Sequence, residues 1–379
     1  MNEIYLDNAA TSFPKPELVA NSVNKAIKIY GANPGRSSYL MSQKTAEEIF
    51  NTRLKIANFF NLEKCENVIF TKNCTEAINI VLFSKLKEGD HIVISDLEHN
   101  SVLRPVHYLT KKGVSYSIFR TYESDEETLS SLRSSIKNNT KLMLCTAASN
   151  VFGFKLPISK LCALCHIYEI ETCIDAAQLA GIDRIDMKNQ SIDYLCIPSH
   201  KGLYGIMGSG ALLCSNDKLS PLSYGGTGTL SLNSEMPDFL PDMLESGTLN
   251  VPGILSMSAG IDFINSIGID RIFTSELNKT IKIYNAFSDI KKVILYTNKP
   301  QKSTFVPLLS FNIKDKNCEE VAEFLSKYNI CVRSGLHCSP LAHKKLGTLN
   351  GTVRVSTSMF NTDKQIDFFI NTIKKYTKS

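Results

Sequence analysis

Lys201 has the sequence neighbours that best suit covalent chemistry. It stands in IPSHKGLYGIMGSG (197–210), directly after Ser199 and His200, and four glycines follow it before residue 211. A lysine amine attacks carbonyl groups only when it is deprotonated, and it then forms Schiff bases with aldehydes. A lone lysine after a strand is usually a solvent-facing charge, so the interpretation depends on the residues that accompany it.

Asp175 is the most informative of these accompanying residues, because it ends the apolar stretch ETCID (171–175). A carboxylate at the end of a buried strand must be paired or hydrogen-bonded, and it can also cap a following helix. An enzyme that uses pyridoxal phosphate (PLP) needs such an acid to keep the pyridine nitrogen protonated, so that the ring can accept electrons. Lys201 and Asp175 together therefore predict a PLP site, and a surface lysine with a helix cap is the alternative.

The elements that must position these residues are short apolar segments separated by helix-like segments. Seven such segments predict strands: 67–70, 91–95, 114–119, 141–147, 171–175, 193–198 and 210–215. This alternation is typical of an α/β fold with a mainly parallel sheet that helices cover on both faces. Polar clusters follow several strand ends, and such ends meet at one edge of the sheet. We expect a pocket at that edge.

The pattern changes after about residue 250, where NVPGI marks a boundary. Further strands and helices, including TFVPLLSFNI, NICVRSG and GTVRVS, predict a smaller α+β unit. We therefore expect a large domain over 16–250, and a small domain made of 1–15 and 251–379.

Composition excludes several classes of protein. The net charge of the 379 residues is +5 and is spread along the chain, which does not suggest nucleic-acid or membrane binding. No secretory signal is visible and no apolar run approaches the ~20 residues of a membrane span. Eleven cysteines in such a chain predict free thiols and a cytoplasmic location.

Motifs along nearly the whole chain resemble one known family. They are YLDNAATSFPKP, LEHNSVL, IDAAQLAG, PSHKGLYGIMGSG, ESGTLN, RSGLHCSPLAH and GTVRVSTSMFNT. In this order they are similar to the class V aminotransferases, in the cysteine desulfurase and selenocysteine lyase branch. The resemblance implies the fold type I of PLP-dependent transferases, with a large domain around a mainly parallel seven-stranded sheet and a smaller α+β C-terminal domain.

The resemblance also implies a set of cofactor contacts. Lys201 matches the lysine that forms the Schiff base with PLP, Asp175 the partner of the pyridine nitrogen, Gln178 the partner of the ring hydroxyl, and His99 the stacked histidine that can also move protons. The matches to phosphate ligands are Thr75, Ser199, His200 and, across a homodimer interface, Thr248. The family often has a second hydroxyl residue before Thr75, where this chain has Cys74.

The substrate end is matched by three residues. Asn150 matches an asparagine near the ring and the substrate, and Arg354 matches the arginine that binds the substrate carboxylate, a task that suits its fork of donors. Cys338, in RSGLHC, matches the catalytic cysteine, with Leu336 in place of a family histidine. His337 and His343 are candidates to lower the pKa of its thiol. Without the resemblance, Arg354 would be a surface residue of an edge strand and Cys338 an ordinary loop thiol.

These residues imply the conversion of L-cysteine to L-alanine, with the sulfur left on Cys338 as a persulfide for an acceptor, which could be a protein. Three alternatives stay open: a selenocysteine lyase that acts on L-selenocysteine, another class V aminotransferase or lyase in which Cys338 is incidental, and a PLP-free scaffold. CALCH (162–166) fits a haem-attachment pattern, but it lies in an amphipathic helical run and is better explained by core packing. No zinc-ligand spacing is found, so we expect no metal site.

Overall fold

The computed structural model describes residues 3–34 and 38–378, and its largest element is a seven-stranded sheet in the order β2-β8-β7-β6-β5-β3-β4. Its strands are β2 (Val68–Thr71), β3 (His91–Ser95), β4 (Ser115–Phe119), β5 (Thr140–Thr146), β6 (Glu171–Asp175), β7 (Tyr194–Pro198) and β8 (Gly210–Cys214). The β4, β3, β5, β6 and β7 strands pair in parallel, whereas β8 is antiparallel to both β7 and β2. The predicted mainly parallel seven-stranded sheet is therefore confirmed.

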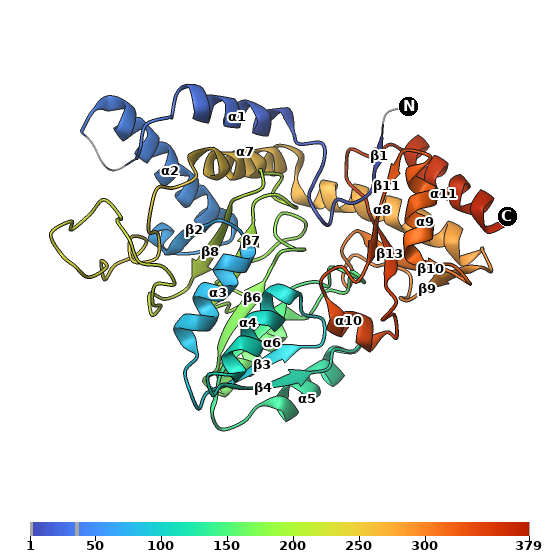
Figure 1. Cartoon of the computed structure of the whole chain (residues 1–379), viewed down its shortest axis with the longest axis horizontal. Coiled ribbons are helices and arrows are strands. Elements are labelled where there is room, and N and C mark those ends of the chain that lie inside the picture. Colours follow the sequence, from blue (N-terminus) through green and yellow to red (C-terminus); the bar gives the residue numbers. More distant parts are fainter. Residues whose placement is uncertain (1–2, 35–37, 379) are drawn as a thin grey trace.

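Helices cover both faces of this sheet (Figure 1). They are α1 (Glu17–Lys28), α2 (Leu40–Phe59), α3 (Cys74–Lys85), α4 (Asn100–Thr110), α5 (Asp125–Ser135), α6 (Ile158–Ile167) and α7 (Val251–Ile267), with a short 3₁₀ turn, Cys65–Asn67, before β2. Successive strand residues point to opposite faces. In β6, for example, Ile174 joins the core with α2, α6 and α7, and Cys173 joins the core with α3 and α4. Burial of both faces explains why these strands read as continuous apolar runs.

The C-terminal part forms a second, smaller body with its own sheet, in the order β12-β13-β10-β9, all antiparallel. Its elements are α8 (Ile269–Ser288), β9 (Val293–Leu295), β10 (Leu308–Ile313), α9 (Cys318–Ser326), β11 (Ile330–Cys331), β12 (Arg333–Gly335), α10 (Pro340–Lys345), β13 (Thr352–Ser356) and α11 (Asp363–Lys378). The blue β1 strand (Ile4–Tyr5) lies among these orange and red elements in Figure 1 and pairs in parallel with β11.

The division of the chain into 16–250 and the remainder stays a prediction, and the hydrophobic cores show how the two parts share residues. The α7 helix packs on α1 and α2 and contributes Ile254, Met257 and Ile261 to the core of the large sheet. The core of the small body takes in Ile283 and Phe287 from the later part of α8. The helix after residue 250 thus belongs, by its packing, with the large sheet.

The segment from Leu6 to Ser12 crosses from the small body to the turn after β7. At one end Ser356 N–H donates to the carbonyl of Leu6 (2.8 Å), and at the other Ser12 N–H donates to the carbonyl of His200 (3.0 Å). The N-terminal residues therefore contact both the small body and the predicted cofactor site.

In the part of the chain that the structure describes, no helix has the length and apolar character needed to cross a membrane.

Candidate active site

A cavity of about 220 Å³ opens at the carboxyl edge of the large sheet. The predicted residues that line it are Thr75, His99, Asn150, Asp175, Gln178, His200 and Lys201. Asp175 ends β6 and Lys201 follows β7, whereas His99 caps α4 and Thr75 lies in the first turn of α3. Parallel strands bring these ends together, as is usual for ligand sites in such sheets.

Lys201 and Asp175 lie on the floor of this cavity. Burial lowers the pKa of the Lys201 amine, and the nearby Asp175 carboxylate opposes that shift in part. Desolvation thus favours the neutral amine, the form that can attack a carbonyl group and accept a proton.

Two donors hold the Asp175 carboxylate by its Oδ1 atom. They are Ala177 N–H at 2.9 Å and the Cys74 thiol at 3.4 Å, and with Asp175 only 2% exposed both contacts are buried. A carboxylate fixed through Oδ1 can offer Oδ2 to a protonated ring nitrogen. Cys74, which departs from the family pattern, therefore contacts the acid of the site.

His99 has a defined tautomer and is neutral. Its Nδ1 accepts a hydrogen bond from Ser101 N–H (3.0 Å), so the ring proton resides on Nε2. Burial lowers the pKa of His99, although Asp175 opposes the shift. A neutral, flat imidazole on the cavity wall suits stacking against an aromatic cofactor.

The predicted phosphate ligands fall into two groups. Thr75 and His200 line the cavity, and His200 Nδ1 is buried without a hydrogen-bond partner among the described residues. Burial lowers the pKa of His200 to about 4. The first N–H groups of α3 add donors beside Thr75, because a helix leaves them unsatisfied.

Ser199 and Thr248 are not among the residues that line this cavity. The Ser199 hydroxyl is buried against Gly205, where an added Cβ would come within 1.9 Å of Ser199 Oγ. This close approach gives Gly205 a packing role. Thr248 is exposed on the surface of the chain. The roles of Ser199 and Thr248 as phosphate ligands stay predictions.

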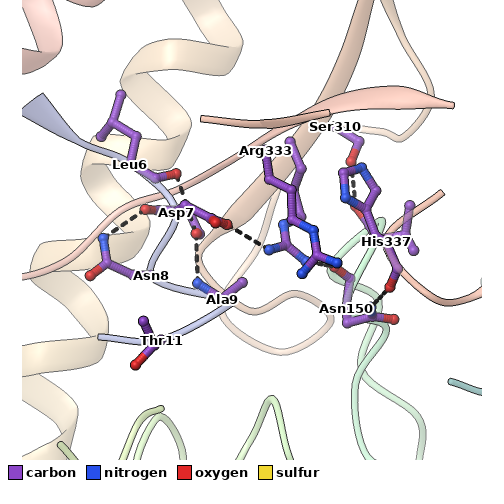
Figure 2. Close-up of polar contacts among 12 residues, drawn as sticks. Leu6, Asp7, Asn8, Ala9, Thr11, Asn150, Ser310, Arg333 and His337 are labelled. Carbon is purple, nitrogen blue, oxygen red and sulfur yellow. Dashed lines mark hydrogen bonds and ion pairs between the residues drawn. The ribbon is translucent and has the colours of Figure 1, made fainter. Parts of the chain in front are cut away.

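Arg354 is not one of the residues that line the cavity, but it contacts one of them, Asn150. It is only 1% exposed, its Nη1 donates to the carbonyl of Asn150 (2.8 Å), and its Nη2 donates to Asp7 Oδ1 (2.7 Å). Figure 2 shows Asp7 and Asn150 on either side of this polar cluster. Sequence reasoning missed Asp7, although it stands in the LDNAATS motif, because its partner is 347 residues away.

The loop that carries Cys338 is hydrogen-bonded to the edge of the cavity. Asn150 Nδ2 donates to the carbonyl of His337 (2.7 Å) and Asn150 Oδ1 accepts from Ser339 Oγ (2.6 Å). Asn100 N–H, beside His99, donates to the carbonyl of Cys338 itself (2.7 Å). The Cys338 side chain is exposed. The structure thus brings an exposed thiol next to the cavity from a distant part of the sequence.

The structure does not support the expectation that His337 and His343 lower the pKa of the Cys338 thiol. Burial lowers the pKa of His337 to about 2 and also lowers that of His343, so both rings are neutral at neutral pH and offer Cys338 no positive charge. The cation beside the thiol is Arg333, whose Nη2 lies 3.8 Å from Cys338 Sγ. Leu336 is 43% exposed, in accordance with a loop position that does not pack into the core.

The residues present fit PLP. The cavity offers an amine with a lowered pKa, a buried carboxylate, a neutral imidazole, and a helix N-terminus with an unpartnered His200 nitrogen for a phosphate. Gln178 adds an amide whose Nε2 donates to the carbonyl of Ala9 (3.0 Å). No group of His, Cys, Asp and Glu suited to a metal ion occurs in residues 3–34 and 38–378.

A family model matches most of the chain. The model of aminotransferase class-V matches residues 4–369. The chain belongs to the aminotransferase class-V family. The family resemblance inferred from the motifs is therefore confirmed.

Relatives of this class V chain carry more specific names. A probable cysteine desulfurase of Methanothermobacter thermautotrophicus is 32% identical, over 99% of this chain and 94% of the relative. The apo structure of a cysteine desulfurase from Thermococcus onnurineus NA1 has a TM-score of 0.90 at 29% identity, covering 99% of this chain and 95% of that one. A mutant C-DES with glycine covalently linked to its PLP cofactor has a TM-score of 0.81 at 19% identity and covers 98% and 96% of the two chains, which shows the shared fold. The predicted fold class is confirmed.

Proposed function

We propose that this class V protein is a PLP-dependent cysteine desulfurase that converts L-cysteine to L-alanine and retains the sulfur on Cys338. The observation that carries the proposal is the docking of an exposed cysteine, through Asn100 and Asn150, beside the cavity of Lys201 and Asp175. The names of full-length relatives at about 30% identity support it.

Bound PLP would supply an electron sink beside the α-carbon of the substrate. Asp175 would hold the ring nitrogen, His99 would cover one face of the ring, and Thr75 with His200 would hold the phosphate. The Lys201 amine, whose pKa burial lowers, would take the proton from the α-carbon of cysteine and return protons to the substrate. Arg354 would bind the substrate carboxylate.

Cys338 completes the transfer. Its thiolate attacks the substrate sulfur, the C–S bond of cysteine breaks, and a new S–S bond forms. Cysteine and the Cys338 thiol thus give alanine and a Cys338 persulfide, and the electrons balance without an external oxidant. The exposed position of Cys338 allows the terminal sulfur to pass to an acceptor.

A homodimer, a cytoplasmic location and an acceptor for the sulfur belong to the proposal. The exposure of Thr248 leaves its side chain available to a second copy of the chain. All eleven cysteines are unpaired, including Cys173 and Cys196, whose sulfur atoms are only 3.8 Å apart, which suits a reducing compartment.

The Cys338→Ala variant tests the desulfurase assignment. We expect it to lose alanine formation from L-cysteine while it retains bound PLP, because only the sulfur acceptor is removed. Unchanged turnover would show a lyase or aminotransferase in which Cys338 is incidental. The same variant assayed on L-selenocysteine separates the selenocysteine lyase, since that activity can persist if selenium leaves without a protein thiol.

The homodimer is tested separately by light scattering of the PLP-loaded protein, with Thr248→Ala as the variant. We expect a dimer, and weaker PLP retention in the variant. A monomer that binds PLP as tightly as the wild type would contradict this part of the proposal.

A further inference from the structure

Asp7 forms an ion pair with the buried Arg354, and this pair joins the N-terminal segment to β13. The side chains are 19% and 1% exposed, and their closest atoms are 2.7 Å apart. A buried guanidinium that loses its counter-ion is strongly destabilising. Arg354 therefore needs an anion when no substrate is bound, and Asp7 provides it.

Two fixed acceptors set the orientation of the guanidinium. Nη2 donates to Asp7 and Nη1 donates to the carbonyl of Asn150, a residue of the cavity wall. Arg354 Nε is buried and has no hydrogen-bond partner among the described residues. A buried donor without an acceptor costs free energy, so this N–H is a place where a ligand oxygen would be stabilising.

The backbone of Asp7 is held by several hydrogen bonds. The Asp7 carbonyl accepts from Ala10 N–H (3.0 Å) and from the Tyr5 hydroxyl (3.2 Å), and Asp7 bridges in parallel to Ser356, two residues beyond Arg354. In Figure 2, Leu6, Asp7, Asn8 and Ala9 lie along one continuous segment. Asp7 is thus carried on backbone that is docked to the strand of its partner.

The charges around Arg354 also favour binding of an anion. Arg333 on β12 lies directly opposite Arg354 on β13, and like charges in that position repel. Asp7 carries one carboxylate against two arginines, so this cluster stays positive and favours an anion such as the α-carboxylate of an amino acid.

We propose that Asp7 is a positioning residue for amino-acid recognition: it holds Arg354 so that the donors left unused by the protein face the α-carboxylate of the substrate. The proposal rests on the assignment of Arg354 as the carboxylate ligand. Asp7 itself does not touch the substrate, so its effect should depend on whether the ligand has a carboxylate.

The test compares the binding of L-alanine with that of ethylamine, which lacks the carboxylate, to PLP-loaded protein by the absorbance of the bound cofactor. In Asp7→Ala we expect about tenfold weaker binding of L-alanine, the scale of one hydrogen bond to a charged group. Asp7→Asn keeps an acceptor without the charge, so a loss of about threefold is expected. Binding of ethylamine should not change in either variant, and Glu3→Gln, on the same segment, is the matched control.

The outcomes distinguish this inference from the proposed function, because alanine binding requires no desulfuration and no Cys338. Equal losses for L-alanine and ethylamine would assign Asp7 a merely structural role. Tighter binding of L-alanine by Asp7→Ala would make Asp7 a competitor of the substrate, and either result overturns the proposal. If Asp7→Ala does not fold, Asp7→Asn decides: a loss confined to L-alanine supports the proposal, and unchanged binding overturns it.

Discussion

The floor of the cavity holds its reactive groups by burial, whereas the Cys338 loop presents its reactive thiol at the surface. Asp175 ends β6 and Lys201 closely follows β7, and both strands are buried along almost their whole length. Cys338 is exposed, and both it and His337 have left-handed backbone conformations, with φ of 60° and 48°, that cost non-glycine residues about 1 kcal/mol or more each. The loop keeps this geometry through hydrogen bonds to Asn100 and Asn150.

The difference teaches that the two halves of the proposed reaction rely on different kinds of structure. Proton transfer at the cofactor relies on groups whose positions and pKa values come from burial in the sheet. Sulfur transfer relies on the Cys338 thiol, which must lie near the cavity and also be accessible to an acceptor. A few hydrogen bonds from the loop to Asn100 and Asn150 hold it there. Substitutions in the two regions should therefore impair different steps of the proposed reaction.

The largest effect is expected on the floor of the cavity. Lys201→Ala should reduce alanine formation from L-cysteine by at least about a hundredfold, because the group that moves the α-proton is lost. Lys201→Arg is the matched control, since it keeps the positive charge but cannot be deprotonated. We expect it to be equally inactive in a steady-state assay. Turnover retained by Lys201→Arg would mean that only the charge is needed.

An intermediate effect is expected at the anchor of the Cys338 loop. Asn150→Ala removes two hydrogen bonds, to His337 and Ser339, and should slow Cys338 persulfide formation about tenfold in a single turnover followed by mass spectrometry. Ser339→Ala removes only one of them and should have a smaller effect. PLP content should stay unchanged in both. A parallel loss of PLP would show that the two regions are not separable in this way.

The smallest effect is expected at Glu276, which links the turn after Lys201 to the segment after β13. It accepts from the Tyr204 hydroxyl, in the turn after Lys201, and from Met359 N–H, beyond β13. Burial raises its pKa from 4.5 to about 7, so between these values the unfolded chain has lost a proton that the folded chain keeps. Stability should therefore fall as pH rises from about 4.5 to about 7, and this contribution should be constant above that.

Glu276→Gln should remove that part of the pH dependence, measured as the difference in unfolding free energy between wild type and variant at several pH values. The difference is needed because Glu98, whose pKa burial raises to about 8, adds a decline of its own. A difference that does not change between pH 5 and 7 would show that Glu276 does not titrate there. If Glu276→Gln has the same turnover as the wild type at one pH, the contacts of Glu276 with Tyr204 and Met359 have no role in catalysis.

The sequence by itself determined the seven strands of the large sheet, because strands buried on both faces appear as short apolar runs between helices. It also placed Asp175, Lys201, His99 and Thr75 at one edge, since each lies at or shortly after a strand end and the ends of parallel strands meet. Local chain order was enough for this part of the site.

Only the tertiary structure decided the contacts between distant segments. It paired Asp7 with Arg354, turned Cys74 toward Asp175, placed Ser199 against Gly205, and packed α7 with the large sheet. It also made His337 and His343 neutral and put Arg333 beside Cys338. The physical reason is that burial, counter-ions and side-chain direction depend on which surfaces meet in space, and residue type and spacing along the chain do not specify those surfaces.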